Sequence, residues 1–187
     1  MNKVAIIASG SGSNAQKIME YFSDNVEVEV SIVLTNNPEA FVIQRADNFE
    51  IPTMVFDKKD LYDSDIVLNQ LLKLNINLIV LAGFLWLIPE NIIEAFPNKI
   101  INIHPALLPK YGGKGMHGLN VHKAVREAQE TETGITIHYV NKDYDEGDII
   151  HQVKCKIDQQ DSPEIIAYKV RKLEHQYFPK TIEKLLF

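Results

Sequence analysis

Short apolar runs alternate with amphipathic segments from the N-terminus to about residue 104. Runs such as "KVAIIAS" and "NLIVLAG" are typical of buried strands, because they are short, apolar and end at small residues. Strands that alternate with helices predict βαβ units around a parallel sheet. We therefore expect strands at 3–9, 28–35, 53–56, 77–83 and 99–104, and helices at about 14–22, after Pro38, at about 61–74 and after Pro89.

The pattern changes after Thr131. Two strand-like runs, "GITIHYV" and "DIIHQVKC", are separated by "NKDYDEG", a polar connection that suits an antiparallel pair at the sheet edge. The next segment offers Ser162 as an N-cap, Pro163 at the first helical position and Glu164 in the first turn. These signals predict a closing C-terminal helix.

Together these elements predict an α/β fold with an open, mostly parallel, doubly wound sheet, an antiparallel edge and a C-terminal helix. The chain has 187 residues, enough to bury most of its apolar surface, and no linker, repeat or low-complexity tract marks a boundary. We expect one domain, residues 1–187. Hydrophobic residues make up 45%, an ordinary globular value, and no run resembles a membrane span or a signal peptide.

Charge and cysteine content narrow the class of partner. The formal net charge of -6 argues against nucleic acid, because affinity for the phosphate backbone comes mainly from clustered Lys and Arg. The single cysteine, Cys155, excludes an internal disulfide and suits a reducing cytoplasm. We expect a cytoplasmic protein that binds small molecules and neither nucleic acid nor membrane; the sequence leaves the oligomeric state open.

The stretch "KIINIHP" ends an apolar run with two polar residues. The period of two in a strand places Asn102 and His104 on one face and Ile101 on the other. Pro105 removes a backbone donor, so the strand should end near His104. The two polar side chains either share a pocket or merely cap the end of the sheet.

The loop "ASGSGSN" joins the first strand to the first helix. Its small residues allow backbone N–H groups to converge on an anion at a helix N-terminus, with Gly12, Ser13 and Asn14 as the candidates. The loop matches neither the dinucleotide pattern nor a Walker loop, because a third glycine and a Gly-Lys-Ser/Thr are both missing. A simple strand-to-helix turn is the alternative.

Two further loops could contribute to a site. The apolar and aromatic segment "FLWLIP" follows a strand at the edge where open α/β sheets bind ligands, although it would equally suit a buried helix start. The turn "NKDYDEGD" holds four carboxylates, and one of them near His104 would raise the pKa of that histidine. Spacing does not choose among the four, which are Asp143, Asp145, Glu146 and Asp148.

Several histidines raise the question of a metal site. No pair among them has a recognised metal-binding spacing, and no acidic cluster flanks them. We therefore expect no metal. The histidines considered are His104, His117, His122 and His138.

Taken together, these segments resemble the phosphoribosylglycinamide formyltransferases, enzymes of purine synthesis. The matching segments are "KVAIIASGSGSN", "VLAGF", "NIHPALLPKY", "DYDEGDII" and "LEHQYFP", in the family's order from about Lys3 to Pro179. The resemblance implies a Rossmann-like formyltransferase fold. It also implies transfer of the formyl group of 10-formyltetrahydrofolate, as cosubstrate, to the amine of 5'-phosphoribosylglycinamide.

The resemblance also implies roles for individual residues. The catalytic residues would be Asn102, His104 and Asp145, the last chosen from the acidic turn because it begins the Asp-x-Gly motif. Thr136 and His138 would support the site. The ribonucleotide substrate would be held by Gly12, Ser13, Asn14, Arg171 and Glu174, and the folate by Lys59, Leu85, Trp86, Leu87, Ile88 and Asn102.

Three features depart from the family pattern. The loop at 112–119, "GGKGMHGL", is longer than in many relatives. Trp86 stands where relatives often carry a basic residue, and Lys59 stands where an arginine is common. The changes at Trp86 and Lys59 affect the expected contacts with the folate, and the longer loop leaves the equivalents of His117 and His122 open.

The implied reaction can be compared with the chemistry of these side chains. Attack of an amine on the formyl group produces a tetrahedral oxyanion, which requires a hydrogen-bond donor such as the amide of Asn102. His104, held protonated by Asp145, would stabilise the oxyanion and give a proton to the departing folate nitrogen. Cys155 lies outside these segments, so we expect no covalent enzyme intermediate.

Other functions are compatible with parts of this pattern. A formyltetrahydrofolate hydrolase would use the same three residues, but such relatives carry an added N-terminal regulatory domain. Methionyl-tRNA formyltransferase shares a similar core but adds a C-terminal RNA-binding domain, and this chain is acidic and ends at Phe187. A non-catalytic module that binds a small ligand is the alternative from a different class.

Overall fold

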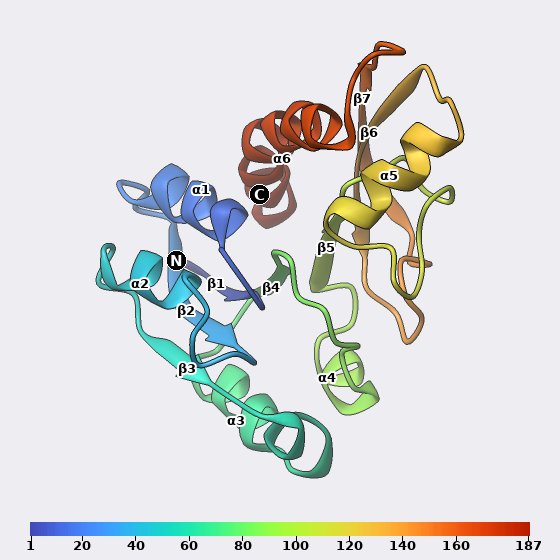
Figure 1. Cartoon of the computed structure of the whole chain (residues 1–187). Helices are drawn as coiled ribbons and strands as arrows, with labels where there is room; N and C mark the ends of the chain where they lie inside the picture. The colour runs from blue at the N-terminus through green and yellow to red at the C-terminus, as the bar shows by residue number, and fades with distance from the viewer.

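Seven strands form one sheet in the computed structural model, which describes residues 1–187 (Figure 1). The strand order is β3-β2-β1-β4-β5-β6-β7, with parallel neighbours from β3 to β5 and antiparallel pairing of β6 with both β5 and β7. The predicted mostly parallel sheet with an antiparallel edge is therefore confirmed. The strands are β1 (Asn2–Ile7), β2 (Val28–Thr35), β3 (Thr53–Val55), β4 (Leu78–Leu81), β5 (Ile100–His104), β6 (Glu132–Tyr139) and β7 (Ile149–Lys156).

Helices cover both faces of the sheet. In Figure 1, α1 and α6 lie on one side of the sheet and α3 and α4 on the other. Each face has its own buried apolar core, one containing residues of α1, α2, α5 and α6 and the other containing residues of α3 and α4. The helices are α1 (Ser13–Phe22), α2 (Val42–Asp47), the π-helix η1 (Lys59–Asp63), α3 (Ile66–Lys73), α4 (Glu90–Ala95), α5 (Leu119–Glu127) and α6 (Pro163–Leu186).

One predicted helix is divided. The continuous helix expected at about 61–74 is instead η1 followed by α3, with extended backbone at Ser64 between them. The Ser64 hydroxyl donates to the carbonyl of Asp60 at 3.1 Å. Serine side chains that bond to nearby backbone in this way compete with regular helix, which accounts for the interruption.

The C-terminal helix begins as its sequence predicts. Ser162 caps α6, accepting a hydrogen bond from the N–H of Ile165 at 3.4 Å, and Pro163 occupies the first helical position. None of the helices combines the length and the apolar character that crossing a membrane requires.

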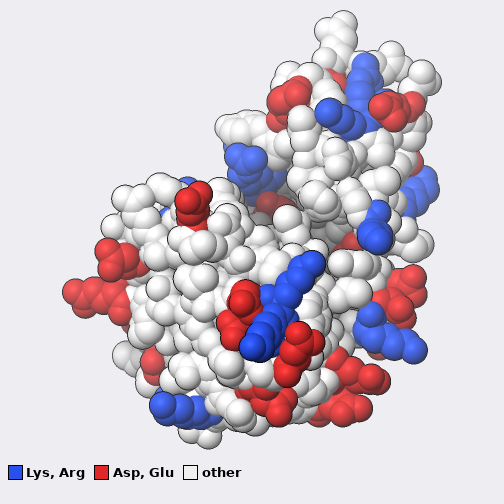
Figure 2. Space-filling view, turned by 60° about the horizontal axis from the view of Figure 1, so that its bottom comes forward, with Lys and Arg blue, Asp and Glu red and all other residues white.

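The strand order decides where a ligand can bind. The chain leaves β1 toward β2 on one side, and later returns to add β4 on the other side of β1. Parallel sheets form a crevice at the carboxyl ends of the strands where the order reverses in this way. The loops after β1 and β4 meet at this point, where the N–H of Ser9 donates to the carbonyl of Gly83 at 3.0 Å. On the face shown in Figure 2, the surface is hollowed between a larger and a smaller lobe, and basic and acidic side chains are interspersed.

A fully buried phenylalanine of the first core offers a test of this packing. Phe178 of α6 is completely buried in the apolar core that also contains residues of α1 and α5. Replacing Phe178 with alanine should lower the free energy of unfolding by about 3–5 kcal/mol, because it removes buried apolar area and leaves a cavity. Urea unfolding measures this change. Tyr168→Ala on the same helix is the control, since Tyr168 is 57% exposed and should cost about 0.5 kcal/mol or less.

Candidate active site

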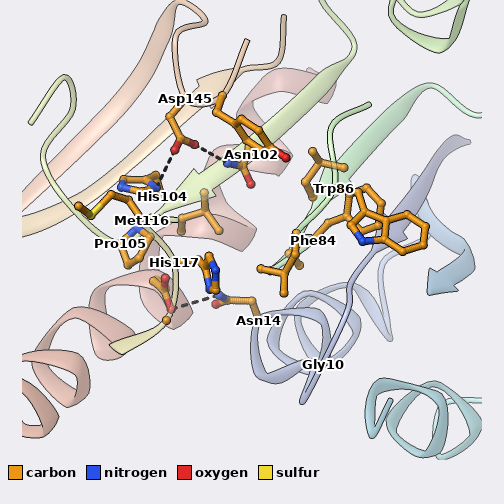
Figure 3. A pocket seen from close by; sticks show the side chains of 18 of the residues that line it. Gly10, Asn14, Phe84, Trp86, Asn102, His104, Pro105, Met116, His117 and Asp145 are labelled. Carbon is orange, nitrogen blue, oxygen red and sulfur yellow. Dashed lines mark hydrogen bonds and ion pairs between the residues drawn. The ribbon is translucent and has the colours of Figure 1, made fainter. Parts of the chain in front are cut away.

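A cavity of about 660 Å³ opens at the carboxyl ends of β1, β4 and β5. Its volume lies in the range of small-molecule sites. In Figure 3, Asn102, His104 and Asp145 lie along one side, Asn14 lies opposite them, and Phe84 and Trp86 form a third wall. Three separate segments of the sequence therefore face one space.

The pairing of β5 with β6 sets the polar wall of the cavity. Asn102 lies opposite His138 in the antiparallel register, and His104 lies opposite Thr136. Residues opposite each other in a sheet project on the same face. The strand end that the sequence predicted to be polar therefore gains a second pair of polar residues from β6.

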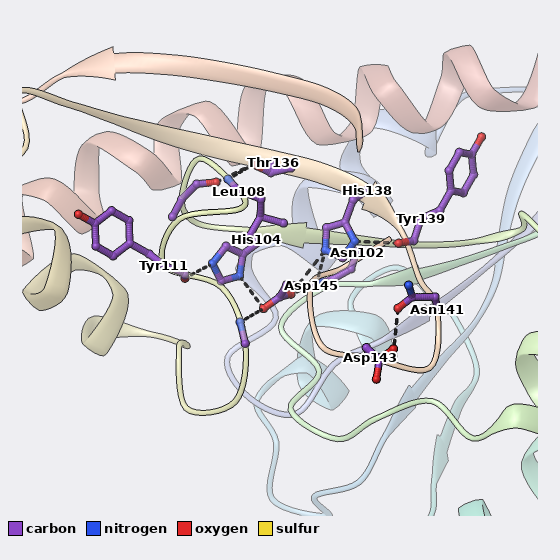
Figure 4. A network of polar contacts seen from close by, with 12 residues as sticks. Asn102, His104, Leu108, Tyr111, Thr136, His138, Tyr139, Asn141, Asp143 and Asp145 are labelled. Carbon is purple, nitrogen blue, oxygen red and sulfur yellow. Dashed lines mark hydrogen bonds and ion pairs between the residues drawn. The ribbon is translucent and has the colours of Figure 1, made fainter. Parts of the chain in front are cut away.

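Four groups converge on the carboxylate of Asp145 (Figure 4). Oδ2 lies 3.4 Å from His104 Nδ1 and accepts a hydrogen bond from the N–H of Gly113 at 3.0 Å. Oδ1 accepts from the amide of Asn102 at 3.3 Å and lies 3.5 Å from His138 Nε2. Of the four acidic residues in the turn between β6 and β7, Asp145 is thus the one that reaches the histidine.

The ring of His104 is held by both of its nitrogens. Nε2 lies 2.7 Å from the carbonyl oxygen of Tyr111, so Nε2 carries a proton and Nδ1 faces Asp145. Tyr111 and Asp145 both have left-handed backbone, each with φ of 58°. Non-glycine residues in this region are strained, and such strain gathers at functional sites. The two strained residues here are the two that orient His104.

Opposing effects act on the pKa of His104. Burial lowers the pKa of His104 and outweighs the Asp145 charge and the Tyr111 hydrogen bond, both of which raise it. Asp145 acts in the predicted direction, but the net pKa lies below the ordinary histidine value. Burial dominates because His104 is only 3% exposed and a charged ring loses hydration there. That Asp145 keeps His104 protonated therefore stays a prediction.

Asp145 itself remains ionised. Burial raises the pKa of its carboxyl group, but the nearby rings of His138 and His104 and the N–H of Gly113 lower it by more. A carboxylate next to an imidazole ring is an arrangement that can accept a proton and release it again.

The amide of Asn102 is already engaged. Its Nδ2 donates to Asp145 and lies 3.2 Å from Nε2 of His138. Nδ1 of His138 is 2.8 Å from the carbonyl of Tyr139, an arrangement in which Nδ1 carries the proton and Nε2 accepts from Asn102. An oxyanion that used Asn102 as donor would therefore have to compete with these two acceptors.

Thr136 supports the site from behind and does not line the cavity. Its hydroxyl donates to the carbonyl of Ala106 at 2.7 Å and accepts from the N–H of Leu108 at 3.0 Å and from the amide of Gln152 at 2.9 Å. These bonds fix the chain that follows His104.

The loop after β1 forms the opposite wall. Gly12, Ser13 and Asn14 all line the cavity, and no side chain caps α1. The amide of Asn14 donates to Glu174 at 3.1 Å, and burial raises the pKa of the Glu174 carboxyl group. Arg171 lines the cavity from the same helix, α6, so all five residues predicted to hold the ribonucleotide lie together.

Unpaired polar atoms lie near this wall. Oδ1 of Asn14 and Nδ1 of His122 are buried without a hydrogen-bond partner. Burial, together with the charges of Arg171 and His104, lowers the pKa of His122 to about 4. Buried polar atoms ordinarily have partners, so these two atoms are candidates for contact with a ligand.

Apolar side chains from the loop after β4 form the third wall. Residues 85–88 line the cavity as predicted, although they form a loop and not the start of a helix. Trp86 packs against Phe56, Phe84 and Tyr62, with ring centroids 6.2–6.3 Å apart. The hydroxyl of Tyr62 donates to the carbonyl of Leu87 at 2.9 Å.

Lys59 does not line the cavity, contrary to its predicted place in the folate pocket. The ammonium group of its neighbour Lys58 lies 5.6 Å from the ring centroid of Trp86. Consecutive residues on a helical turn point in different directions, which accounts for the separation of the two lysines.

Sequence reasoning missed the backbone groups and one side chain of the site. The carbonyl of Tyr111 and the N–H of Gly113 carry no sequence signal, since every residue has these groups. The hydroxyl of Ser9 accepts from the N–H of Leu85 at 3.1 Å and ties the anion loop to the apolar loop. The sequence signal for Ser9 was a short polar residue inside the glycine-rich loop.

Known proteins resemble this chain over its whole length. The formyl transferase family model matches residues 2–182. A phosphoribosylglycinamide formyltransferase of Bacillus subtilis is 37% identical and covers 100% of this chain and 95% of its own. A chloroplastic phosphoribosylglycinamide formyltransferase of Arabidopsis thaliana is 40% identical over 96% of this chain, which spans 64% of that protein.

Solved structures agree with this relationship. The crystal structure of phosphoribosylglycinamide formyltransferase from Bacillus halodurans superposes with a TM-score of 0.88 at 36% identity, covering 99% of this chain and 95% of that one. Sequence and fold thus lead to the same group of proteins, and this chain belongs to the phosphoribosylglycinamide formyltransferase family.

Proposed function

We propose that this protein transfers the formyl group of 10-formyltetrahydrofolate to the amine of 5'-phosphoribosylglycinamide, in purine biosynthesis. The observation that carries the proposal is the contact of His104 and Asn102 with the carboxylate of Asp145, at 3.4 and 3.3 Å, beside one cavity. An anion-binding loop and an apolar wall flank this group on two sides of the same cavity.

The two walls suit the two substrates. A phosphate would bind at the uncapped N-terminus of α1, where backbone N–H groups and the helix dipole favour negative charge. Arg171 forms no ion pair within the protein, so its charge is available to that phosphate, and Glu174 can accept hydrogen bonds from ribose hydroxyls. The apolar residues at 85–88 suit the flat pterin ring of the folate.

The proposed reaction moves one proton and involves no oxidation or reduction. The amine nitrogen attacks the formyl carbon, a C–N bond forms, and the formyl oxygen becomes an oxyanion. The bond from the formyl carbon to N10 then breaks, the amine loses one proton and N10 gains one. Much of the acceleration would come from holding the two substrates in line.

A neutral His104 can carry this proton. Nε2 is held by the Tyr111 carbonyl, so in a neutral ring Nδ1 carries the lone pair. Nδ1 would take the proton of the attacking amine and return it to N10, and the Asp145 carboxylate, 3.4 Å from Nδ1, would stabilise the charged ring. A histidine that is already protonated before the reaction is the alternative. Asn102 would donate a hydrogen bond to the oxyanion. Its hydrogen bond to Asp145 would weaken at the same step, because the imidazolium then balances the negative charge of Asp145.

The proposal extends to the setting of the enzyme. One continuous sheet supports the interpretation of residues 1–187 as a single formyltransferase domain. The net charge of -6 favours small substrates over nucleic acid, and the free thiol of Cys155 suits a reducing cytoplasm.

A single assay tests the proposed reaction. We expect the purified protein to formylate glycinamide ribonucleotide from 10-formyltetrahydrofolate without added metal, nicotinamide or ATP. Folate deformylation at the same rate with and without the amine would indicate a hydrolase instead. Absence of any turnover would indicate a binding module.

Removing the imidazole tests the role of His104. His104→Ala should lower kcat by about 10²–10⁴, the usual contribution of a general acid–base group, while the KM values of both substrates change little. Steady-state kinetics measure both parameters. A variant with nearly normal kcat would refute the assigned role.

The pH profile separates the two possible roles of His104. Because burial lowers the His104 pKa, kcat should be constant above pH 6.5, the ordinary histidine value, and fall at lower pH as the ring becomes protonated. Asp145→Asn removes a charge that raises this pKa, so the fall should move to still lower pH. His151→Asn, outside the cavity, is the control. A kcat that rises as the ring becomes protonated would instead favour a histidine that must be charged before the reaction.

A further inference from the structure

Hydrogen bonds turn the carbonyl groups of the loop after β1 away from the cavity. The carbonyl of Gly10 accepts from the N–H of Val42 at 3.2 Å, and that of Ser11 accepts from Nε of Arg45 at 2.7 Å. The carbonyl of Gly12 accepts from Gln16 in the first turn of α1. Three consecutive carbonyls are therefore fixed, two of them by α2.

Fixing a carbonyl also fixes the next N–H. The peptide bond is planar and trans, so its C=O and N–H point in opposite directions. When Ser11 O points to Arg45, the N–H of Gly12 points the other way. Gly12 lines the cavity and Arg45 does not, so the N–H is turned toward the cavity. No backbone acceptor takes this N–H.

The loop after β1 packs closely against α2. Gly12 has φ of 68°, and a Cβ at this position would lie 2.4 Å from a methyl group of Val42. The backbone of the loop therefore rests directly on α2. Arg45 is the only side chain that holds a carbonyl of this loop, and its guanidinium lies 4.8 Å from the ring centroid of Phe41, which helps to orient it.

We propose that Arg45 is a positioning residue for the anion-binding loop, and that it acts through the Nε–H bond to Ser11 and not through its charge. The inference rests on the proposed function only for the identity of the anion, the phosphate of the ribonucleotide. Without this bond the Ser11 peptide can rotate and turn its carbonyl oxygen toward the phosphate, which would repel it.

Three substitutions separate the bond from the charge. In Arg45→Gln an amide nitrogen occupies the position of Nε, bonded to the same Cδ, and the charge is lost. In Arg45→Lys the charge is kept, but a methylene group occupies that position. Arg45→Met lacks both the donor and the charge. Lys17→Gln removes a nearby charge that lies outside the cavity and is the matched control.

The positioning role predicts a specific order of affinities. Arg45→Met and Arg45→Lys should raise the KM of glycinamide ribonucleotide about threefold to tenfold, as expected for the loss of one hydrogen bond whose strength does not depend on the charge. The KM of the folate and kcat should stay within about twofold. Arg45→Gln and Lys17→Gln should stay close to the wild-type protein. A normal KM in Arg45→Lys with a raised KM in Arg45→Gln would show a charge effect and overturn the proposal, as would normal values in all the variants.

Binding of inorganic phosphate gives a second readout that needs no turnover. Titration of the ligand-free variants, followed by the amide signals of Ser13 and Asn14, should show the same order of affinities, with unchanged thermal unfolding as the check of folding. If the protein lacked formyl transfer but phosphate binding kept this order, the proposed function would fail and the role of Arg45 would stand. Equal phosphate affinity in Arg45→Met and the wild-type protein would refute that role.

Discussion

Two histidines, an asparagine and a backbone N–H surround the carboxylate of Asp145, and this one negative charge joins the turn after β6 and the loop at 112–119 to the paired strands β5 and β6. The turn between β6 and β7 carries the carboxylate, β5 and β6 carry the side chains, and the loop at 112–119 provides the Gly113 N–H. Because a buried carboxylate is costly without such partners, the contacts select one arrangement of all these segments. The polar wall of the cavity depends on that selection.

Much of the architecture could be predicted from the sequence because its signals are local. Alternating apolar runs gave the order of strands and helices, and the cap at Ser162 marked the start of α6. Period-two spacing placed Asn102 and His104 on one face, as found. The interruption at Ser64 was missed because it depends on a side-chain bond to the backbone that competes with helix, and the pattern of apolar residues does not register that bond.

The side chains of the site could be predicted from the sequence, but their protonation could not. Motif resemblance brought together the catalytic candidates, but the protonation of His104 depends on a balance between burial and charge that only coordinates provide. Similarly, the rotation of one helical turn decides that Lys58, and not Lys59, lies next to Trp86. Backbone donors and acceptors such as those of Gly113 and Tyr111 leave no trace in the residue types.

The register of β5 with β6 has a consequence for how the enzyme is made. His138 comes opposite Asn102 only when strands far apart in the chain have paired without a slip, and Asp145 reaches them only once β7 has joined. Pairings between distant segments form slowly, because the intervening chain must first be closed into a loop. A partly folded chain in which β5, β6 and β7 have not yet paired therefore lacks the polar wall of the cavity altogether.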